Sequence, residues 1–234
     1  MTLYALTVTL HAGLGTLALA TFWLAGLSRK GSPLHRAAGK VYLPTMATLL
    51  LAAVPLALAV IQRMPVAGSF LFYLLLITVT SVWSSWRAVK DKKDWARYTG
   101  PVFHALMWAN LLGALAIAGV GLFLAKHMQL VIVAFSGIGL VGFVQMWRFS
   151  RRPPQDPRWW LREHLTAMLG NGVATHIAFL SIGLPKLLPM LAGPTLQKLA
   201  WLGPLFLAFL AGAYLTRKFL PKRAVPMAGA RVAG

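Results

Sequence analysis

Residues 41–62 read VYLPTMATLLLAAVPLALAVIQ, a stretch of 22 residues that contains no charged side chain. A helix of this length crosses the roughly 30 Å hydrocarbon core of a bilayer, because it rises about 1.5 Å per residue. A helix on the surface of a soluble protein would place charged residues along one face, and this stretch has none to place. The stretch is therefore predicted to span a membrane.

Six further apolar stretches resemble it and are separated by short charged loops. They cover residues 3–27, 69–87, 101–125, 130–149, 160–183 and 199–216. No segment between them is long enough or polar enough to form a soluble domain. We therefore predict an all-α, polytopic transmembrane helical bundle of seven spans. It forms one transmembrane domain over residues 1–218, and residues 219–234 form a short basic tail.

The chain is strongly basic, with 23 Lys and Arg against 4 Asp and Glu and a formal net charge of +19. In a soluble protein this imbalance would indicate nucleic-acid binding. Here 58% of the residues are hydrophobic, compared with roughly 45–50% in soluble domains. We therefore expect no nucleic-acid partner and interpret the charge as a record of membrane topology.

The basic residues fall almost entirely in alternate loops and the tail. The exceptions are Arg63, Lys126, Lys186 and Lys198. Because cytoplasmic loops are enriched in Lys and Arg, this distribution predicts an outside N-terminus and a cytoplasmic C-terminus. The expected location is the bacterial cytoplasmic (inner) membrane, with the lipid bilayer and anionic lipids at the cytoplasmic face as partners.

The composition also narrows the chemistry. The chain has no Cys, which excludes disulfides, thiolate metal sites and a Cys nucleophile. Its four acidic residues lie outside the middle of every predicted span, which argues against ion-coupled transport through intramembrane carboxylates. They are Asp91, Asp94, Asp156 and Glu163.

Four of the six histidines lie within or at the edges of predicted spans. Counted from the span midpoints, His11 and His176 sit roughly 6 Å to the outer side, and His104 and His164 roughly 12–13 Å to the cytoplasmic side. Two imidazoles at one level, from different helices, are what a bis-histidine haem needs. We expect His11 and His176 as haem-iron ligands of an outer haem b, and His104 and His164 as candidate ligands of an inner one.

An alternative is that these histidines are polar residues hydrogen-bonded between helices. His164 and His176 are twelve residues apart, which turns them about 120° from each other around their helix, whereas ligands of stacked sites would lie nearly in line. Gly15 and Gly172 share faces with His11 and His176. These glycines are expected either to leave room for a flat ring or to let helices pack closely.

Two short elements carry a resemblance. Leu34 to Tyr42, LHRAAGKVY, resembles the H-R-x-x-G-x-V-Y element of a large uncharacterised family of bacterial multi-pass membrane proteins, in which it precedes a helix. Residues 160–170, WLREHLTAMLG, resemble a second element in which a Trp and a His open a late helix. The resemblance implies a multi-pass helical fold and no particular activity. A looser similarity to di-haem cytochrome b bundles implies bis-histidine haem.

His35 and Arg36 of the first element have two interpretations. They bind an anionic group at the cytoplasmic face, such as a lipid phosphate or a haem propionate, or a quinone head. Alternatively, they close the first helical hairpin by hydrogen-bonding exposed carbonyls, with Gly39 ending a turn.

The leading functional hypothesis is a membrane b-type cytochrome-like protein that moves electrons between haem and a quinone or a partner protein. The alternative is a non-catalytic accessory or assembly subunit of a larger respiratory or photosynthetic membrane complex. Short loops, faces of small residues and the scarcity of acids agree with that alternative equally well.

Overall fold

The computed structural model describes residues 2–126 and 128–220, and this part of the chain is helical without any strand. Its seven long helices are α1 (Leu3–Leu27), α2 (Pro33–Arg63), α3 (Pro65–Lys90), α5 (Pro101–Gly119), α6 (Gln129–Arg151), α7 (Trp159–Ala178) and α9 (Pro194–Phe219). The short elements are α4 (Trp95–Tyr98), α8 (Leu184–Leu187) and the 3₁₀ turn η3 (Pro189–Leu191). Two π-helical segments, η1 (Val120–Leu124) and η2 (Phe179–Gly183), continue α5 and α7.

The prediction of seven membrane-spanning helices is confirmed, since seven helices of the described chain are long and apolar enough to cross a bilayer. The bounds differ most at α2, which begins at Pro33 rather than near residue 41. Ser32 caps it by accepting a hydrogen bond from the His35 amide at 3.2 Å, and Pro33 occupies the first turn. This combination is typical of a helix start. The LHRAAGK segment is therefore part of the helix, and its placement before the helix was wrong.

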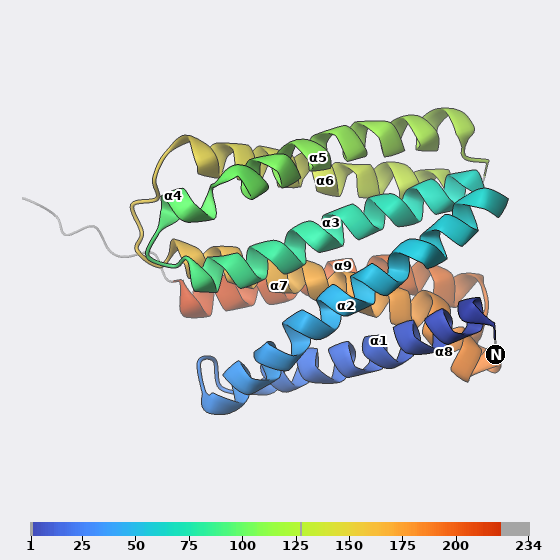
Figure 1. Cartoon of the computed structure of the whole chain (residues 1–234), viewed down its shortest axis with the longest axis horizontal. Coiled ribbons are helices and arrows are strands. Elements are labelled where there is room, and N and C mark those ends of the chain that lie inside the picture. Colours follow the sequence, from blue (N-terminus) through green and yellow to red (C-terminus); the bar gives the residue numbers. More distant parts are fainter. Residues whose placement is uncertain (1, 127, 221–234) are drawn as a thin grey trace, which may run out of the picture.

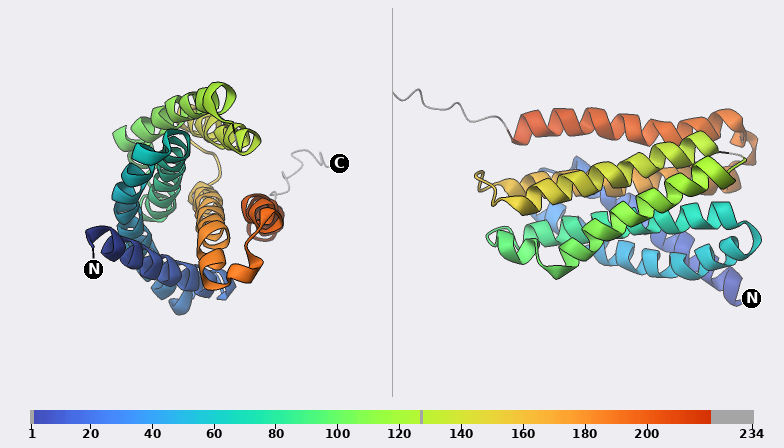
Figure 2. Two further views of the ribbon diagram at one scale, coloured as in Figure 1. Left: turned by 90° about the vertical axis from the view of Figure 1, so that its right-hand side faces the viewer. Right: turned by 90° about the horizontal axis from the view of Figure 1, so that it is seen from above.

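The long helices run along a common axis (Figure 1). Helix α3 packs against α2, α5 and α7, so it lies inside the bundle together with α7. The end-on view in Figure 2 shows the α1–α2 hairpin on one side of this pair and the α5–α6 hairpin on the other. Helix α9 lies against α7 at the edge of the bundle.

One end of the bundle, here called the basic end, gathers the turn at residues 28–32, the segment at residues 91–100, the start of α7 and the end of α9 (Figure 1). Most of the described Lys and Arg residues belong to these segments or to the helix turns beside them. The predicted tail at residues 219–234 lies outside the described residues from position 221 onward.

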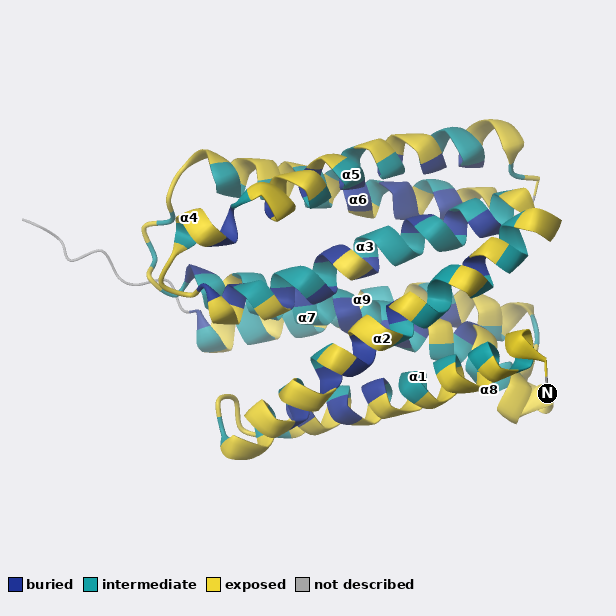
Figure 3. Ribbon diagram, in the orientation of Figure 1, coloured by how far each residue is buried: buried dark blue, intermediate teal, exposed yellow. Residues whose placement is uncertain are grey.

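The buried residues, dark blue in Figure 3, are mostly apolar with some polar groups among them. Leu112, Phe123 and Phe209 are exposed on outward faces, as is expected where lipid rather than water surrounds the helices. A bilayer is therefore the environment that this surface fits.

Inside the bundle, the Tyr73 hydroxyl donates a hydrogen bond to the carbonyl of Phe135 at 2.9 Å and accepts one from the amide of Gly139 at 2.9 Å.

Candidate functional site

His164 lies in the second turn of α7, half-buried at the basic end. Its Nδ1 is 2.9 Å from the backbone carbonyl oxygen of Ser85 on α3. A carbonyl only accepts, so Nδ1 is the protonated nitrogen, and in the neutral ring Nε2 has the lone pair. The packing of α7 on α3 thus fixes both the orientation and the tautomer of this imidazole.

His35 has the same arrangement on α2. Its Nδ1 is 3.0 Å from the carbonyl oxygen of Ala25 in the last turn of α1. Nδ1 therefore donates here as well, and Nε2 of the neutral ring is again the lone-pair atom. The cap of α2 at Ser32 fixes the backbone from which this ring projects.

The turn between α1 and α2 shows how the hairpin closes. Lys30 Nζ donates to the carbonyls of Ala25 at 3.1 Å and of Gly26, and the Arg36 guanidinium donates to the carbonyl of Gly31 at 3.0 Å. The two Lys30 bonds satisfy carbonyls that the end of α1 leaves without a helical partner. Gly31, with φ of 77°, makes the turn. The expectation that Gly39 ends a turn was wrong, because Gly39 lies within α2.

His35 and His164 come from distant parts of the sequence to the same end of the bundle. Both His35 and Lys30 lie within electrostatic range of His164. The two sequence elements that carry the resemblance, residues 34–42 and 160–170, therefore both reach the basic end, where the charge of His35 acts on His164. Among the described residues, no group of three or more His, Asp or Glu side chains is placed to hold a metal ion. Two imidazoles form the donor set that a haem iron needs.

The surroundings of His176 differ from those expected of a haem-iron ligand. Its Nδ1 is 2.7 Å from the carbonyl of Gly172, and its Nε2 accepts a hydrogen bond from Trp23 Nε1 at 2.9 Å. The rings of Phe22 and Trp23 both meet the imidazole edge to face. Both ring nitrogens are thus engaged within the protein, as in the alternative interpretation of a histidine bonded between helices.

The room expected beside the glycines is filled by side chains. A Cβ on Gly172 would lie 2.5 Å from Cζ of Phe22, and a Cβ on Gly15 would lie 3.5 Å from a methyl group of Leu49. These contacts correct the expectation of a ring-sized space, because the glycines serve close packing of α1 with α7 and α2.

His11 and His176 are not brought together. His11 is half-buried, and its Nδ1 lies near the backbone of Leu49 without completing a hydrogen bond to any described residue. Trp23, the partner of His176, is twelve residues further along α1, which is about 18 Å of helix rise. His176 therefore faces a different section of α1.

The expected pairing of His104 with His164 stays a prediction. His104 lies in the first turn of α5, exposed, with Nδ1 3.2 Å from the carbonyl of Gly100. Helix α5 packs against α6 and α3. Among the described residues, no hydrogen bond or ring contact joins His104 to His164, whereas the charge of His35 acts on His164.

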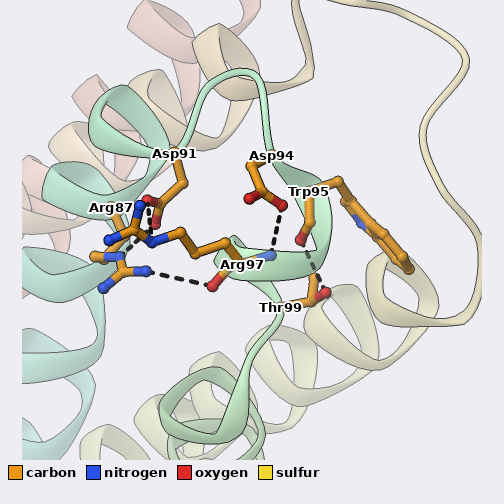
Figure 4. A network of polar contacts seen from close by, with 6 residues as sticks. All are labelled: Arg87, Asp91, Asp94, Trp95, Arg97 and Thr99. Atoms are coloured by element: carbon orange, nitrogen blue, oxygen red, sulfur yellow. Dashed lines mark hydrogen bonds and ion pairs between the residues drawn. The ribbon is translucent and has the colours of Figure 1, made fainter.

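A polar network near this site was not anticipated from the sequence (Figure 4). The buried carboxylate of Asp91 pairs with Arg87 one turn earlier on α3 and with Arg97 at 3.5 Å. This network anchors the segment that joins α3 to α5. The i, i+4 spacing of Arg87 and Asp91 was the one sequence signal that could have indicated part of it.

Tyr98, which is fully buried beside this network, donates to Oε2 of Glu163 at 3.3 Å. Burial, followed by the negative charge of Glu163, raises the pKa of the Tyr98 phenol. Tyr98 therefore remains a neutral donor next to the residue that precedes His164.

Comparisons with known protein-family models, with curated proteins and with solved structures give no match to this chain.

Proposed function

We propose that the protein is a membrane b-type cytochrome-like electron-transfer protein, in which His35 and His164 ligate the iron of a haem b near one membrane face. One observation supports this most directly. Each ring donates Nδ1–H to a backbone carbonyl, at 3.0 Å for His35 and 2.9 Å for His164, and so directs a lone pair through Nε2.

This arrangement fits haem for a chemical reason. A carbonyl that accepts from Nδ1–H fixes an imidazole and raises the basicity of Nε2, a common feature of ligating histidines. His35 and His164 would hold the haem iron, which would supply one-electron chemistry when bound.

Cationic side chains beside the pair suit haem propionates. Burial, and then the nearby charge of Lys218, lower the pKa of Lys30. An anion next to Lys30 would offset both effects. Arg36, in the same turn as His35, offers a guanidinium fork for a carboxylate. These two residues are the proposed propionate partners.

The proposal differs from the two haem sites expected from depth alone. His35 replaces His104 as the partner of His164. His11 and His176 are left out, because both nitrogens of His176 are engaged. We further propose that the basic end faces the cytoplasm of a bacterial cell, as the positive-inside rule suggests. A quinone or a partner protein would exchange electrons with the haem there.

The test is the reduced-minus-oxidised absorption spectrum of the full chain, produced with sufficient haem and purified in mild detergent. We expect a Soret band and a sharp α band in a one-to-one ratio of haem to chain. A colourless protein that copurifies with a stoichiometric membrane partner would contradict the proposal and favour an accessory subunit.

A further inference from the structure

Helices α2 and α3 meet at Met64 and diverge toward the basic end (Figure 1). An apolar groove of about 550 Å³ lies between them. This volume is within the roughly 300–1,000 Å³ typical of sites for small molecules. Its walls include Leu43, Ala47 and Leu51 of α2 and Val79, Trp83 and Trp86 of α3.

A second hollow of about 330 Å³ lies at the basic end. Trp83 lines both, so the two hollows share a wall. Arg87, Arg97 and the backbone turn at Gly100 line the second one. The apolar groove therefore adjoins a pocket lined by two guanidinium groups.

The charge of this pocket is not balanced within it. Arg87 and Arg97 share a single buried carboxylate, that of Asp91. The side chain of Arg97 is 61% exposed, so much of its guanidinium is open to a further partner. Lys90 lies over the ring of Trp86 at 4.8 Å and adds a second exposed cation at the rim of the groove.

We propose that this composite site binds an anionic phospholipid, with an acyl chain in the α2–α3 groove and the phosphate on Arg97 and Lys90. An apolar groove next to a cationic pocket matches a molecule that has a long apolar chain and one negative charge at its end. A neutral phospholipid would leave the excess charge of the pocket uncompensated. A free phosphate would leave the groove unused. The inference is independent of haem binding, since it involves neither His35 nor His164.

The test is native mass spectrometry of the full chain in detergent, titrated with phosphatidylglycerol and phosphatidylcholine that have identical acyl chains. We expect the wild type to bind phosphatidylglycerol about thirtyfold more tightly, because Arg97 and Lys90 each contribute about 1 kcal/mol toward an anionic lipid. Glycerol 3-phosphate, which has no acyl chain, is expected not to compete. Competition by it at lipid concentrations would show a phosphate site and overturn the proposal.

Two pairs of variants separate the headgroup from the chain. Arg97→Gln should reduce the preference for phosphatidylglycerol to about fivefold, while Arg152→Gln, at an exposed residue that lines neither hollow, should keep it. Ala47→Trp, which fills the groove, should weaken the binding of both phospholipids severalfold. Ala105→Trp, on the exposed face of α5, should leave the binding of both unchanged. Equal retention of both lipids by the wild type, or equal effects of the two arginine variants, would overturn the proposal.

Discussion

The Nδ1–H of His164 donates to the backbone carbonyl of Ser85 across 2.9 Å, which joins α7 to α3 at the end of the bundle where basic residues gather. The bond links residues 79 positions apart in the sequence. It orients the imidazole before any ligand is present, because the donor comes from one helix and the acceptor from the other.

Loss of this bond should destabilise the bundle. His164→Phe leaves the Ser85 carbonyl without its side-chain donor, and we expect a loss of about 1 kcal/mol in the free energy of unfolding. The matched control is His104→Phe, whose ring is exposed and bonds only within its own helix. Thermal unfolding in detergent, followed by circular dichroism, measures both variants. Equal melting temperatures for the two would show that the interhelical bond contributes nothing.

Gly172 should be intolerant of even one methyl group. A Cβ there would lie 2.5 Å from Cζ of Phe22, so Gly172→Ala must displace that ring and its neighbours Trp23 and His176. We expect a loss of about 1–3 kcal/mol, typical of overpacking.

The control for this change is Gly13→Ala on α1, where a Cβ would meet no atom within 4 Å. That substitution should be neutral or stabilise by up to about 1 kcal/mol, because alanine favours the helix. The melting temperatures of the two variants in detergent are compared with that of the wild type. A Gly172→Ala variant that melts at the wild-type temperature would refute the described packing of Phe22.

Asp91 should be critical for the segment between α3 and α5. Asp91→Asn removes the buried partner of Arg87 and Arg97, and we expect a loss of about 2–3 kcal/mol, below the 3–5 kcal/mol of fully buried pairs because Arg97 is largely exposed. Asp94→Asn should cost only a few tenths of a kcal/mol, since asparagine also caps the short helix that Asp94 begins. Limited proteolysis between residues 91 and 100 provides the measurement, and equal cleavage of both variants would contradict it.

Tyr98 should stay protonated at high pH. Its pKa is raised by burial and by the charge of Glu163, so its neutral form is favoured in the folded state. The stability that this provides is fully present below the unfolded pKa of about 10 and is lost as pH rises through the higher folded value. An alkaline absorbance titration should therefore show the same number of ionising tyrosines in the folded wild type and in Tyr98→Phe. One extra ionising group near pH 10 in the folded wild type would contradict the buried hydrogen bond to Glu163.

A helix in lipid must form its backbone hydrogen bonds internally and must expose apolar side chains. Long apolar stretches of sequence meet both requirements, and the seven spans were therefore predictable from hydropathy. The helix rotations were not predictable. Inward and outward faces are both apolar in a bilayer, so residue depth is encoded in the sequence while the direction of a side chain is not. His11 and His176 illustrate this, since the actual partner of His176 is Trp23, 153 positions away.

The sequence places His35 between predicted spans and predicts that it binds an anionic group or a quinone head or closes the first hairpin. Ser32 followed by Pro33 was the available signal, because a capping serine and a proline in the first turn indicate that a helix starts there. The bond of His35 to Ala25 then depends on how tightly the turn folds back, which Gly31 at φ of 77° determines.

Ligation by His35 and His164 is tested most directly by the ferric absorption and electron paramagnetic resonance spectra of the haem-loaded protein and three variants. We expect a low-spin, bis-imidazole signal in the wild type and in His104→Ala. His35→Ala and His164→Ala should lose that signal and regain it when free imidazole is added, which distinguishes a lost ligand from a misfolded chain. Low-spin spectra that are unchanged in both His35→Ala and His164→Ala, or a wild type that takes up no haem, would contradict the assignment.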